Sequence, residues 1–315
     1  RFSVDYINPD LNVLPLSGTR EGIFSFIQCA IDTSKENPKV LLPNPFYKIY
    51  EGAAIMAGAE PYYVNSEESN GFKPDFASIP ESVWKDCQLL ILCSPSNPTG
   101  YCLDKKEYKE LLSKAEKYNF LLCSDECYID IYESNAHPPV GLLECDDLSE
   151  PNSKSVVFHS LSKRSNLAGL RSGFICAGKE VIEKLSLYRT YHGVTLSFPM
   201  QKASTWAWSD KDHVQANRLE YDKKYKAAIS CLDSIEDLER PQGGFYFWLK
   251  LPCDDEIFAK TLYQEESVLS LPGSYLATEN NGSNPGKGYL RLAVVHDIET
   301  ITKAFNAVNK TLKKF

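Results

Sequence analysis

One stretch, FHSLSKRSNLAGLRSGF at residues 158–174, sets the fold of this chain and points to its chemistry. An apolar, strand-like run leads into a small polar turn that holds Ser160, Ser162 and Lys163. Arg171 follows the lysine by eight residues and directly precedes a second strand-like run. The pattern predicts a β-turn-β corner at which serines, a lysine and an arginine are gathered.

Composition excludes several classes of protein. The chain has 315 residues, a net charge of −8, 43% hydrophobic and 24% charged residues, which is typical of a soluble globular protein of one or two domains. No long basic run suggests a nucleic-acid partner, and no apolar run reaches the ~18 residues of a membrane helix. The ten cysteines include no C-x2-C pair and several lie in apolar runs, which predicts reduced structural thiols, a cytoplasmic location and no metal site.

Short apolar runs alternate with amphipathic, charge-rich segments such as residues 105–118. Such strands, separated by helices, predict an α/β fold with three layers, in which a mostly parallel sheet is covered on both faces. The large domain is expected at residues 1–208. A smaller α+β domain, which includes a linking helix at 212–232, is expected at residues 209–315. The expected strands are residues 12–16, 40–42, 61–64, 89–93, 120–124, 156–159, 174–177, 243–249, 268–271 and 289–295, with a last helix at 298–312.

Polar residues follow several of these strands, at the sheet edge where ligands of parallel sheets bind. The segment SGTR at residues 17–20 opens a helix whose free N–H groups suit a phosphate, although a plain N-cap also explains it. Asn97 follows one buried strand, as a turn residue or an amide donor, and Asp125 ends another. A buried carboxylate needs a partner, which can be a metal ion, a helix N-terminus or a protonated heterocyclic nitrogen.

Together these groups meet the requirements of pyridoxal 5′-phosphate. The phosphate can be bound by a helix end and Arg171, and the ring nitrogen can pair with Asp125. The phenolic oxygen can accept hydrogen bonds from Asn97 and Tyr128, and the aldehyde can react with Lys163. The chain also resembles the class I/II aminotransferases, which are fold-type I pyridoxal-phosphate enzymes. Six motifs in family order carry the resemblance: SGTRE, PNPFYKIY, SPSNPTG, SDECY, SLSKRSNLAGLRSGF and YLRLAVV. Within that family the chain is most similar to the bacterial N-succinyldiaminopimelate aminotransferases, through LSGTREGIFSF, YRTYHG and RPQGGFYFWL.

The resemblance implies a role for each catalytic residue. Lys163 would form the Schiff base with the cofactor aldehyde and would then move the proton during transamination. Asp125 would pair with the pyridinium N–H, and Tyr128 and Asn97 would hydrogen-bond the phenolic oxygen. The implied phosphate-binding residues are Gly18, Thr19, Arg20, Ser160, Ser162 and Arg171.

The resemblance also implies contacts to the ring and to the substrate. Tyr47 matches the aromatic residue that stacks on the cofactor ring, with a packed core tyrosine as the alternative. Arg291 matches the arginine that binds the substrate α-carboxylate beside Asn97, and an arginine among apolar strand residues does need an anionic partner. Arg164 is a candidate contact to phosphate or substrate. The sequence does not identify the residue that binds the distal group of the substrate.

The expected activity is that of a pyridoxal-phosphate-dependent transaminase with amino-acid and 2-oxo-acid substrates. The subfamily resemblance implies an N-succinyl-L,L-2,6-diaminopimelate:2-oxoglutarate aminotransferase of bacterial lysine and diaminopimelate biosynthesis. One alternative is another class I aminotransferase, for aspartate, aromatic amino acids or LL-diaminopimelate. Others are a pyridoxal-phosphate-dependent C–S lyase and a non-catalytic regulatory domain that binds the cofactor.

The resemblance implies a homodimer with shared active sites. Family members carry an N-terminal segment that closes the substrate site and donates a tyrosine across the dimer interface. Nothing in the chain matches that segment, so the N-terminal arm is expected to be missing and the active site of this chain to be incomplete.

Overall fold

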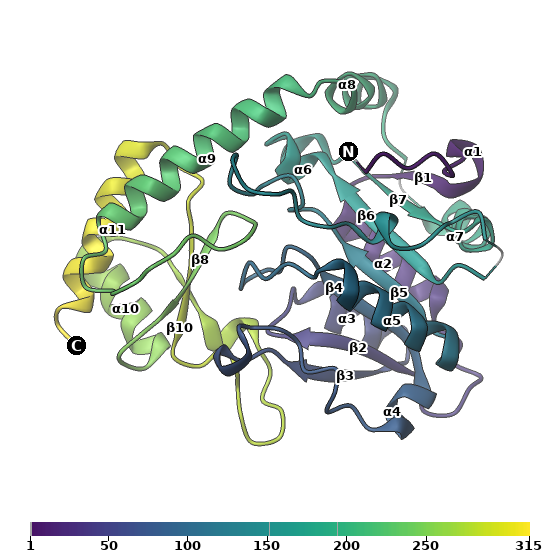
Figure 1. Ribbon diagram of the computed structural model, residues 1–315, viewed down its shortest axis with the longest axis horizontal. Coiled ribbons are helices and arrows are strands. Elements are labelled where there is room, and N and C mark those ends of the chain that lie inside the picture. Colours follow the sequence, from purple (N-terminus) through teal and green to yellow (C-terminus); the bar gives the residue numbers. More distant parts are fainter. Residues whose placement is uncertain (1, 151, 194) are drawn as a thin grey trace.

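Short apolar segments form the centre of a seven-stranded sheet in the computed structural model, which describes residues 2–150, 152–193 and 195–315 (Figure 1). The strand order is β1-β7-β6-β5-β4-β2-β3. Within this sheet β7 runs antiparallel to both of its neighbours, and the other strands all share one direction. The strands are β1 (Val13–Leu16), β2 (Lys39–Asn44), β3 (Glu60–Asn65), β4 (Cys87–Cys93), β5 (Leu121–Asp125), β6 (Ser155–Ser160) and β7 (Gly173–Ala177).

Alternating side chains divide the buried residues of the sheet between its two faces. Along β4, for example, Leu89 and Ile91 join one hydrophobic cluster, whereas Leu90 and Leu92 join the other. The first cluster packs against α2 (Thr19–Ala30), α3 (Ile49–Met56) and α7 (Lys179–His192), and the second against α4 (Glu81–Asp86) and α5 (Lys105–Tyr118). The predicted three-layer α/β fold with a mostly parallel sheet is therefore confirmed (Figure 1).

Helix α5 shows how local sequence signals at both ends of a helix predict its bounds. The Asp104 side chain accepts a hydrogen bond from the Glu107 N–H while the Glu107 side chain accepts one from the Asp104 N–H, which forms a capping box. Buried Leu111 and Ala115 follow at helical spacing, and Asn119 ends the helix in the left-handed conformation. The predicted range 105–118 agrees with the observed helix.

A second, three-stranded antiparallel sheet has the order β8-β10-β9 and packs with α10 (Asp255–Glu266) and α11 (Ile298–Leu312). Its strands are β8 (Tyr246–Lys250), β9 (Leu271–Pro272) and β10 (Tyr289–Ala293). The prediction of a strand at 268–271 is wrong, because Ser267 ends α10 in the left-handed conformation and pairing begins only at Leu271. The predicted last helix is confirmed as α11.

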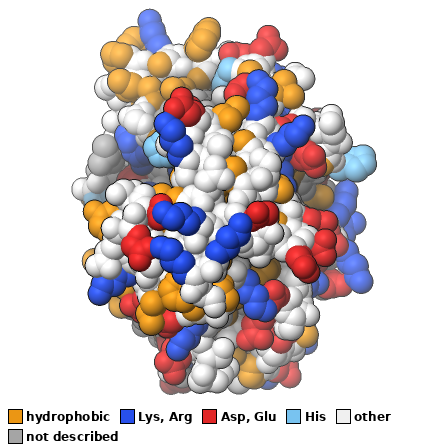
Figure 2. Space-filling model, turned by 90° about the vertical axis from the view of Figure 1, so that its left-hand side faces the viewer, with side chains coloured by type: hydrophobic (Ala, Val, Ile, Leu, Met, Phe, Trp, Pro, Cys, Tyr) orange, Lys and Arg blue, Asp and Glu red, His pale blue; other side chains and the backbone are white. Residues whose placement is uncertain are grey.

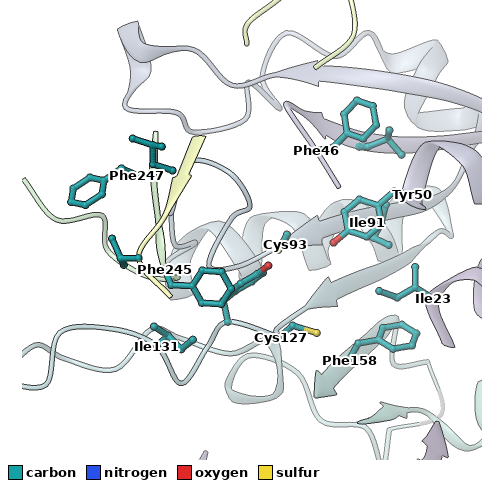
Figure 3. Packing of buried hydrophobic residues seen from close by; sticks show 14 of the residues in the cluster. Ile23, Phe46, Tyr50, Ile91, Cys93, Cys127, Ile131, Phe158, Phe245 and Phe247 are labelled. Atoms are coloured by element: carbon teal, nitrogen blue, oxygen red, sulfur yellow. The ribbon is translucent and has the colours of Figure 1, made fainter. Parts of the chain in front are cut away.

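The two sheets share one hydrophobic core. Phe158 on β6 and Tyr50 on α3 belong to the same buried cluster as Phe247 on β8 and Phe305 on α11. Figure 3 shows side chains of this cluster reaching from the large sheet to Phe245 and Phe247. The long helix α9 (Asp212–Ser230) connects the two halves and packs on α11 (Figure 1).

The surface is charged and mixed in sign. On the face turned to the viewer in Figure 2, Lys and Arg side chains alternate with Asp and Glu. Among the helices described, none is both long and apolar enough to cross a membrane.

The connection between β6 and β7 differs from the predicted simple turn. It contains a one-turn helix, α6 (Leu161–Arg164), and a short 3₁₀ segment (Ala168–Leu170). The Ser160 side chain accepts a hydrogen bond from the Ser162 N–H at 3.0 Å and thereby caps α6. This cap favours a helical turn directly after the strand, and Lys163 lies in that turn.

Candidate active site

The predicted site residues meet at one edge of the large sheet. Strands β1, β2, β4, β5 and β6 end at this edge, and the antiparallel strand β7 begins there. A cavity of about 580 Å³ opens at this edge, between the two sheets. Ten of the predicted residues line it: Thr19, Arg20, Tyr47, Asn97, Asp125, Tyr128, Ser162, Lys163, Arg171 and Arg291.

One end of the cavity is suited to an anion. Helix α2 begins at Thr19, and its first N–H groups, like those of any helix, have no acceptor within the helix. No side chain of the N-cap residue Gly18 accepts from them, so they are suited to an anion. Arg171 has a left-handed backbone (φ 54°), and its guanidinium lies so close to Gly18 that a Cβ at this position would overlap it. A non-glycine residue in this conformation is costly and often marks a functional site.

Asp125 is a carboxylate almost removed from water, with 4% of its surface exposed. The Tyr50 hydroxyl donates to its Oδ2 at 2.7 Å, and the Cys127 backbone N–H donates to its Oδ1 at 3.2 Å. Burial raises the pKa of Asp125, although the Cys127 side chain, these two hydrogen bonds and nearby Lys163 lower it in part. Such a carboxylate is suited to a buried cationic partner.

Lys163 lies half-buried on α6 and faces the same cavity. Burial lowers the pKa of its amine, Arg20 and Arg291 lower it further, and Asp125 and Cys127 oppose the shift. A lowered pKa increases the fraction of neutral, nucleophilic amine near neutral pH.

Arg291 reaches the cavity from β10 of the small sheet. Its Nη1 donates to the Asn97 Oδ1 at 2.9 Å, and its guanidinium carbon lies 4.4 Å from the centroid of the Tyr246 ring. The Tyr246 hydroxyl lies 3.2 Å from that of Tyr128, whose pKa is raised well above its usual value by burial. The Tyr128 hydroxyl is therefore a neutral donor.

Tyr47 lies at the cavity wall, where its hydroxyl accepts a hydrogen bond from the Arg20 Nε. Its ring packs edge-on against Tyr50, with centroids 5.6 Å apart. It thus lies at the cavity surface rather than among the fully buried core residues.

Two predicted residues contribute differently from the rest. Gly18 provides backbone and space beside Arg171, and the Ser160 hydroxyl is used in capping α6 and in donating to the Ser172 carbonyl at 3.3 Å. Arg164 does not line the cavity, so the expected contact to phosphate or substrate is wrong. Its guanidinium is bound by carbonyls at the end of α8 (Phe198–Ser209) and by Asp130.

Sequence reasoning missed five cavity residues with functional side chains: Lys48, Tyr50, Cys93, Cys127 and Tyr246. Tyr50 stands three residues after Tyr47 in PNPFYKIY, so a helical turn after the first tyrosine was the available signal. Tyr246 carries no such signal, because it reaches the cavity only through the packing of the second sheet.

Comparison with known proteins agrees with this geometry. The model of the family "Aminotransferase class I and II" matches residues 3–308, so the chain belongs to this family. The LL-diaminopimelate aminotransferase of Aquifex aeolicus is 32% identical over 319 residues, which cover 99% of this chain and 78% of that protein.

Solved structures show the same fold. The crystal structure of an aminotransferase from Neisseria meningitidis superposes with a TM-score of 0.92 at 40% identity, over 99% of this chain and 79% of that chain. A probable N-succinyldiaminopimelate aminotransferase from Thermus thermophilus has a TM-score of 0.85 at 26% identity, over 99% and 81% of the two chains. The protein is therefore a pyridoxal-phosphate-dependent transaminase.

The residues present fit pyridoxal 5′-phosphate. The uncapped start of α2 and Arg171 offer donors for a phosphate, and Asp125 offers a buried carboxylate for a ring nitrogen. Lys163 offers an amine of lowered pKa to the aldehyde from the same cavity.

Substitution of Gly18 by alanine tests the anion-binding end. The new Cβ would meet the Arg171 guanidinium at a backbone φ of 88°, so Arg171 must move and cofactor affinity should fall about tenfold or more. The dissociation constant of pyridoxal 5′-phosphate, titrated into the apo-protein, measures the effect. Gly71→Ala is the matched control, because Gly71 also has a positive φ (67°) but faces open space. Equal loss in both variants would contradict the assigned role of Gly18.

Proposed function

We propose that the protein transfers an amino group between an N-succinylated diaminopimelate and 2-oxoglutarate, with Lys163, Asp125 and Tyr128 as its catalytic residues. The observation that supports this proposal is that the Lys163 amine, the Asp125 carboxylate and the Arg291 guanidinium line the same cavity. Two similar proteins named above act, by their names, on LL-diaminopimelate and on its N-succinylated form. Both names describe a long amino acid with a second charged end.

The charge of the cavity favours the succinylated form. Of the residues that line it in the described parts of the chain, Arg20, Lys48, Arg171 and Arg291 are cationic in addition to Lys163, whereas Asp125 alone is acidic. The distal end of free LL-diaminopimelate carries an ammonium group beside its carboxylate, and this ammonium would face the excess of positive charge in the cavity. Succinylation converts the ammonium into a neutral amide and adds a second carboxylate, so the distal end becomes anionic and matches the cavity.

Each proposed role follows from the position of a side chain. Pyridoxal 5′-phosphate, when bound, supplies an aldehyde for the amino group and a ring that withdraws electrons from the substrate α-carbon. The neutral Lys163 amine accepts the α-proton and returns it. Asp125 would hold a proton at the ring nitrogen, while the Tyr128 hydroxyl and the Asn97 amide N–H₂ would donate to the phenolic oxygen.

The substrate is oriented by Arg291. Asn97 accepts from one Nη of this guanidinium and leaves the rest of it free to bind the α-carboxylate through two parallel hydrogen bonds. This clamp holds the α-carbon at a constant position beside Lys163.

Lys163→Ala combined with a substrate panel tests the activity. The wild-type protein should form glutamate from 2-oxoglutarate most efficiently with N-succinyl-L,L-diaminopimelate, ahead of LL-diaminopimelate, aspartate and phenylalanine. Lys163→Ala should lower kcat by about 10²–10⁴-fold, because the residue that moves the proton is lost. Lys179→Ala, at an exposed lysine of α7, is the control. Full turnover by Lys163→Ala, or release of ammonia and pyruvate instead of glutamate, would refute the proposal.

We propose that the Arg20 side chain binds the distal carboxylate. It is exposed at the cavity, its Nε donates to Tyr47, and the rest of its guanidinium is available to a ligand. Its backbone N–H, at the start of α2, remains a phosphate donor, so the two functions are separable.

Arg20→Ala should raise KM for the succinylated substrate about tenfold to a hundredfold, since a charge-assisted hydrogen bond is lost. The dissociation constant of pyridoxal 5′-phosphate should change little, because the backbone N–H is kept. Arg20→Lys, which retains the charge, should lose less. Steady-state kinetics with the succinylated substrate and with alanine, which lacks a distal carboxylate, provides the comparison. An equal rise of KM for both would refute a distal role.

We propose that the protein forms a homodimer through α7 and α8. Leu187 and Tyr191 on α7 and Phe198, Met200 and Trp206 on α8 expose large apolar surfaces, with Trp206 71% exposed. Figure 2 shows hydrophobic side chains gathered at the end of the molecule where Figure 1 places α8. Apolar surface of this kind typically marks a protein–protein contact, and a second copy of the chain is the partner that the family implies.

Light scattering should show a dimer for the wild-type protein and a monomer for Trp206→Glu, because a charge in an apolar contact is not solvated. Leu219→Glu, at an exposed position of α9, is the control and should remain dimeric. A monomeric wild-type protein, or dissociation by the control alone, would refute this interface.

A further inference from the structure

Tyr50 is hydrogen-bonded to the Asp125 carboxylate, on which the site depends. It is 1% exposed and belongs to α3, on the face of the sheet covered by α2 and α7. Its hydroxyl donates to the Asp125 Oδ2 at 2.7 Å. Figure 3 shows this hydroxyl pointing toward the side where Cys93 and Cys127 lie.

The direction of this hydrogen bond is determined by chemistry. An ionised carboxylate only accepts, so the tyrosine must be the donor. The pKa of Tyr50 is raised well above its usual value, first by burial and then by Asp125, so it keeps its proton. Asp125 thus has one donor on each oxygen, Tyr50 on Oδ2 and the Cys127 N–H on Oδ1.

Few titratable groups other than Tyr50 affect the protonation of the Asp125 carboxylate. The titratable groups that interact with this carboxylate are Tyr50 from α3, Cys93 from β4, Cys123 from β5, Cys127 after β5 and Lys163 from α6. Burial raises the pKa of all three thiols, so they remain neutral. The neutral Cys127 thiol, the Tyr50 hydroxyl and the Cys127 N–H are therefore the donors that offset the desolvation of Asp125, and Tyr50 is the one that comes from outside its own loop.

We infer that Tyr50 is a positioning residue which keeps the Asp125 carboxylate ionised and oriented toward the ring nitrogen of the cofactor. This inference rests on the proposed role of Asp125. Two donors at different oxygens fix the plane of the carboxylate, and each oxygen still has a lone pair for a further partner. A carboxyl group that is protonated or rotated would pair poorly with a cationic ring nitrogen.

A packing role predicts a different behaviour from a positioning role. Loss of the hydroxyl raises the pKa of Asp125 above its already raised value, since a hydrogen bond to the charged form is removed. The neutral carboxyl then predominates at acid pH, whereas at alkaline pH the carboxylate is ionised with or without Tyr50. A positioning defect is therefore largest at low pH, and a packing defect is the same at all pH values.

Tyr50→Phe is the test, and titration of pyridoxal 5′-phosphate into the apo-protein is the readout. Affinity should fall about threefold to tenfold at about pH 6, as expected for one lost hydrogen bond, and the deficit should shrink toward about pH 9. Tyr108→Phe is the matched control and should bind normally at both pH values. Tyr108 is also fully buried, but its hydroxyl contacts the Ser124 Oγ at 3.0 Å, on the other face of the sheet.

A double-mutant cycle completes the test. In an Asp125→Ala background, Tyr50→Phe should cause no additional loss of affinity, because the hydroxyl has lost the group through which it acts. Additive losses, or a pH-independent deficit with a lower melting temperature, would assign Tyr50 to packing and overturn the inference.

The same titrations separate this inference from the proposed function. If Asp125→Ala weakens binding and Tyr50→Phe does not, the role of Asp125 stands and the inference about Tyr50 is overturned. If Asp125→Ala binds the cofactor as tightly as the wild-type protein, the proposed role of Asp125 is wrong, and the inference is overturned with it.

Discussion

The burial of the Asp125 carboxylate is the constraint on which the site depends. Removing a carboxylate from water is costly unless hydrogen bonds or a cation compensate. Here the Cys127 side chain, the Tyr50 hydroxyl and the Cys127 N–H compensate in part, and the pKa of the group remains raised. The incomplete compensation favours a cationic partner, which the pyridine ring of the family's cofactor can provide.

Sheet topology explains why the other functional groups surround this carboxylate. Strands that share a direction present their carboxyl ends at one edge, and connections at that edge supply ligand-binding residues. Asp125 ends β5, Asn97 follows β4, and Lys163 follows β6. The antiparallel strand β7 adds Arg171 from its start, beside the first turn of α2. The second sheet adds Arg291 and Tyr246, and the shared hydrophobic core holds it against the first.

The distribution of charge is equally constrained. The chain has a net charge of −8, yet cationic residues greatly outnumber acidic ones in the cavity. Such an inversion concentrates positive potential at one place and supports anionic substrates and an anionic cofactor. Burial lowers the pKa of Lys163, and Arg20 and Arg291 lower it further because they disfavour another positive charge. The same cations thus serve binding and the reactivity of the amine.

Sequence by itself determined the three-layer fold, most strands and helices, and the identity of most polar residues at the cavity, because these follow from local periodicity, capping signals and ordered motifs. The capping box of α5 and the strand that ends at Asp125 are examples. Only the tertiary structure decided that Tyr50 donates to Asp125, that Tyr246 meets Tyr128, and that Arg164 turns away to the end of α8. These contacts join residues distant in the sequence, except that Arg164 directly follows Lys163. They depend on helix packing and on the placement of the second sheet, which no local pattern encodes.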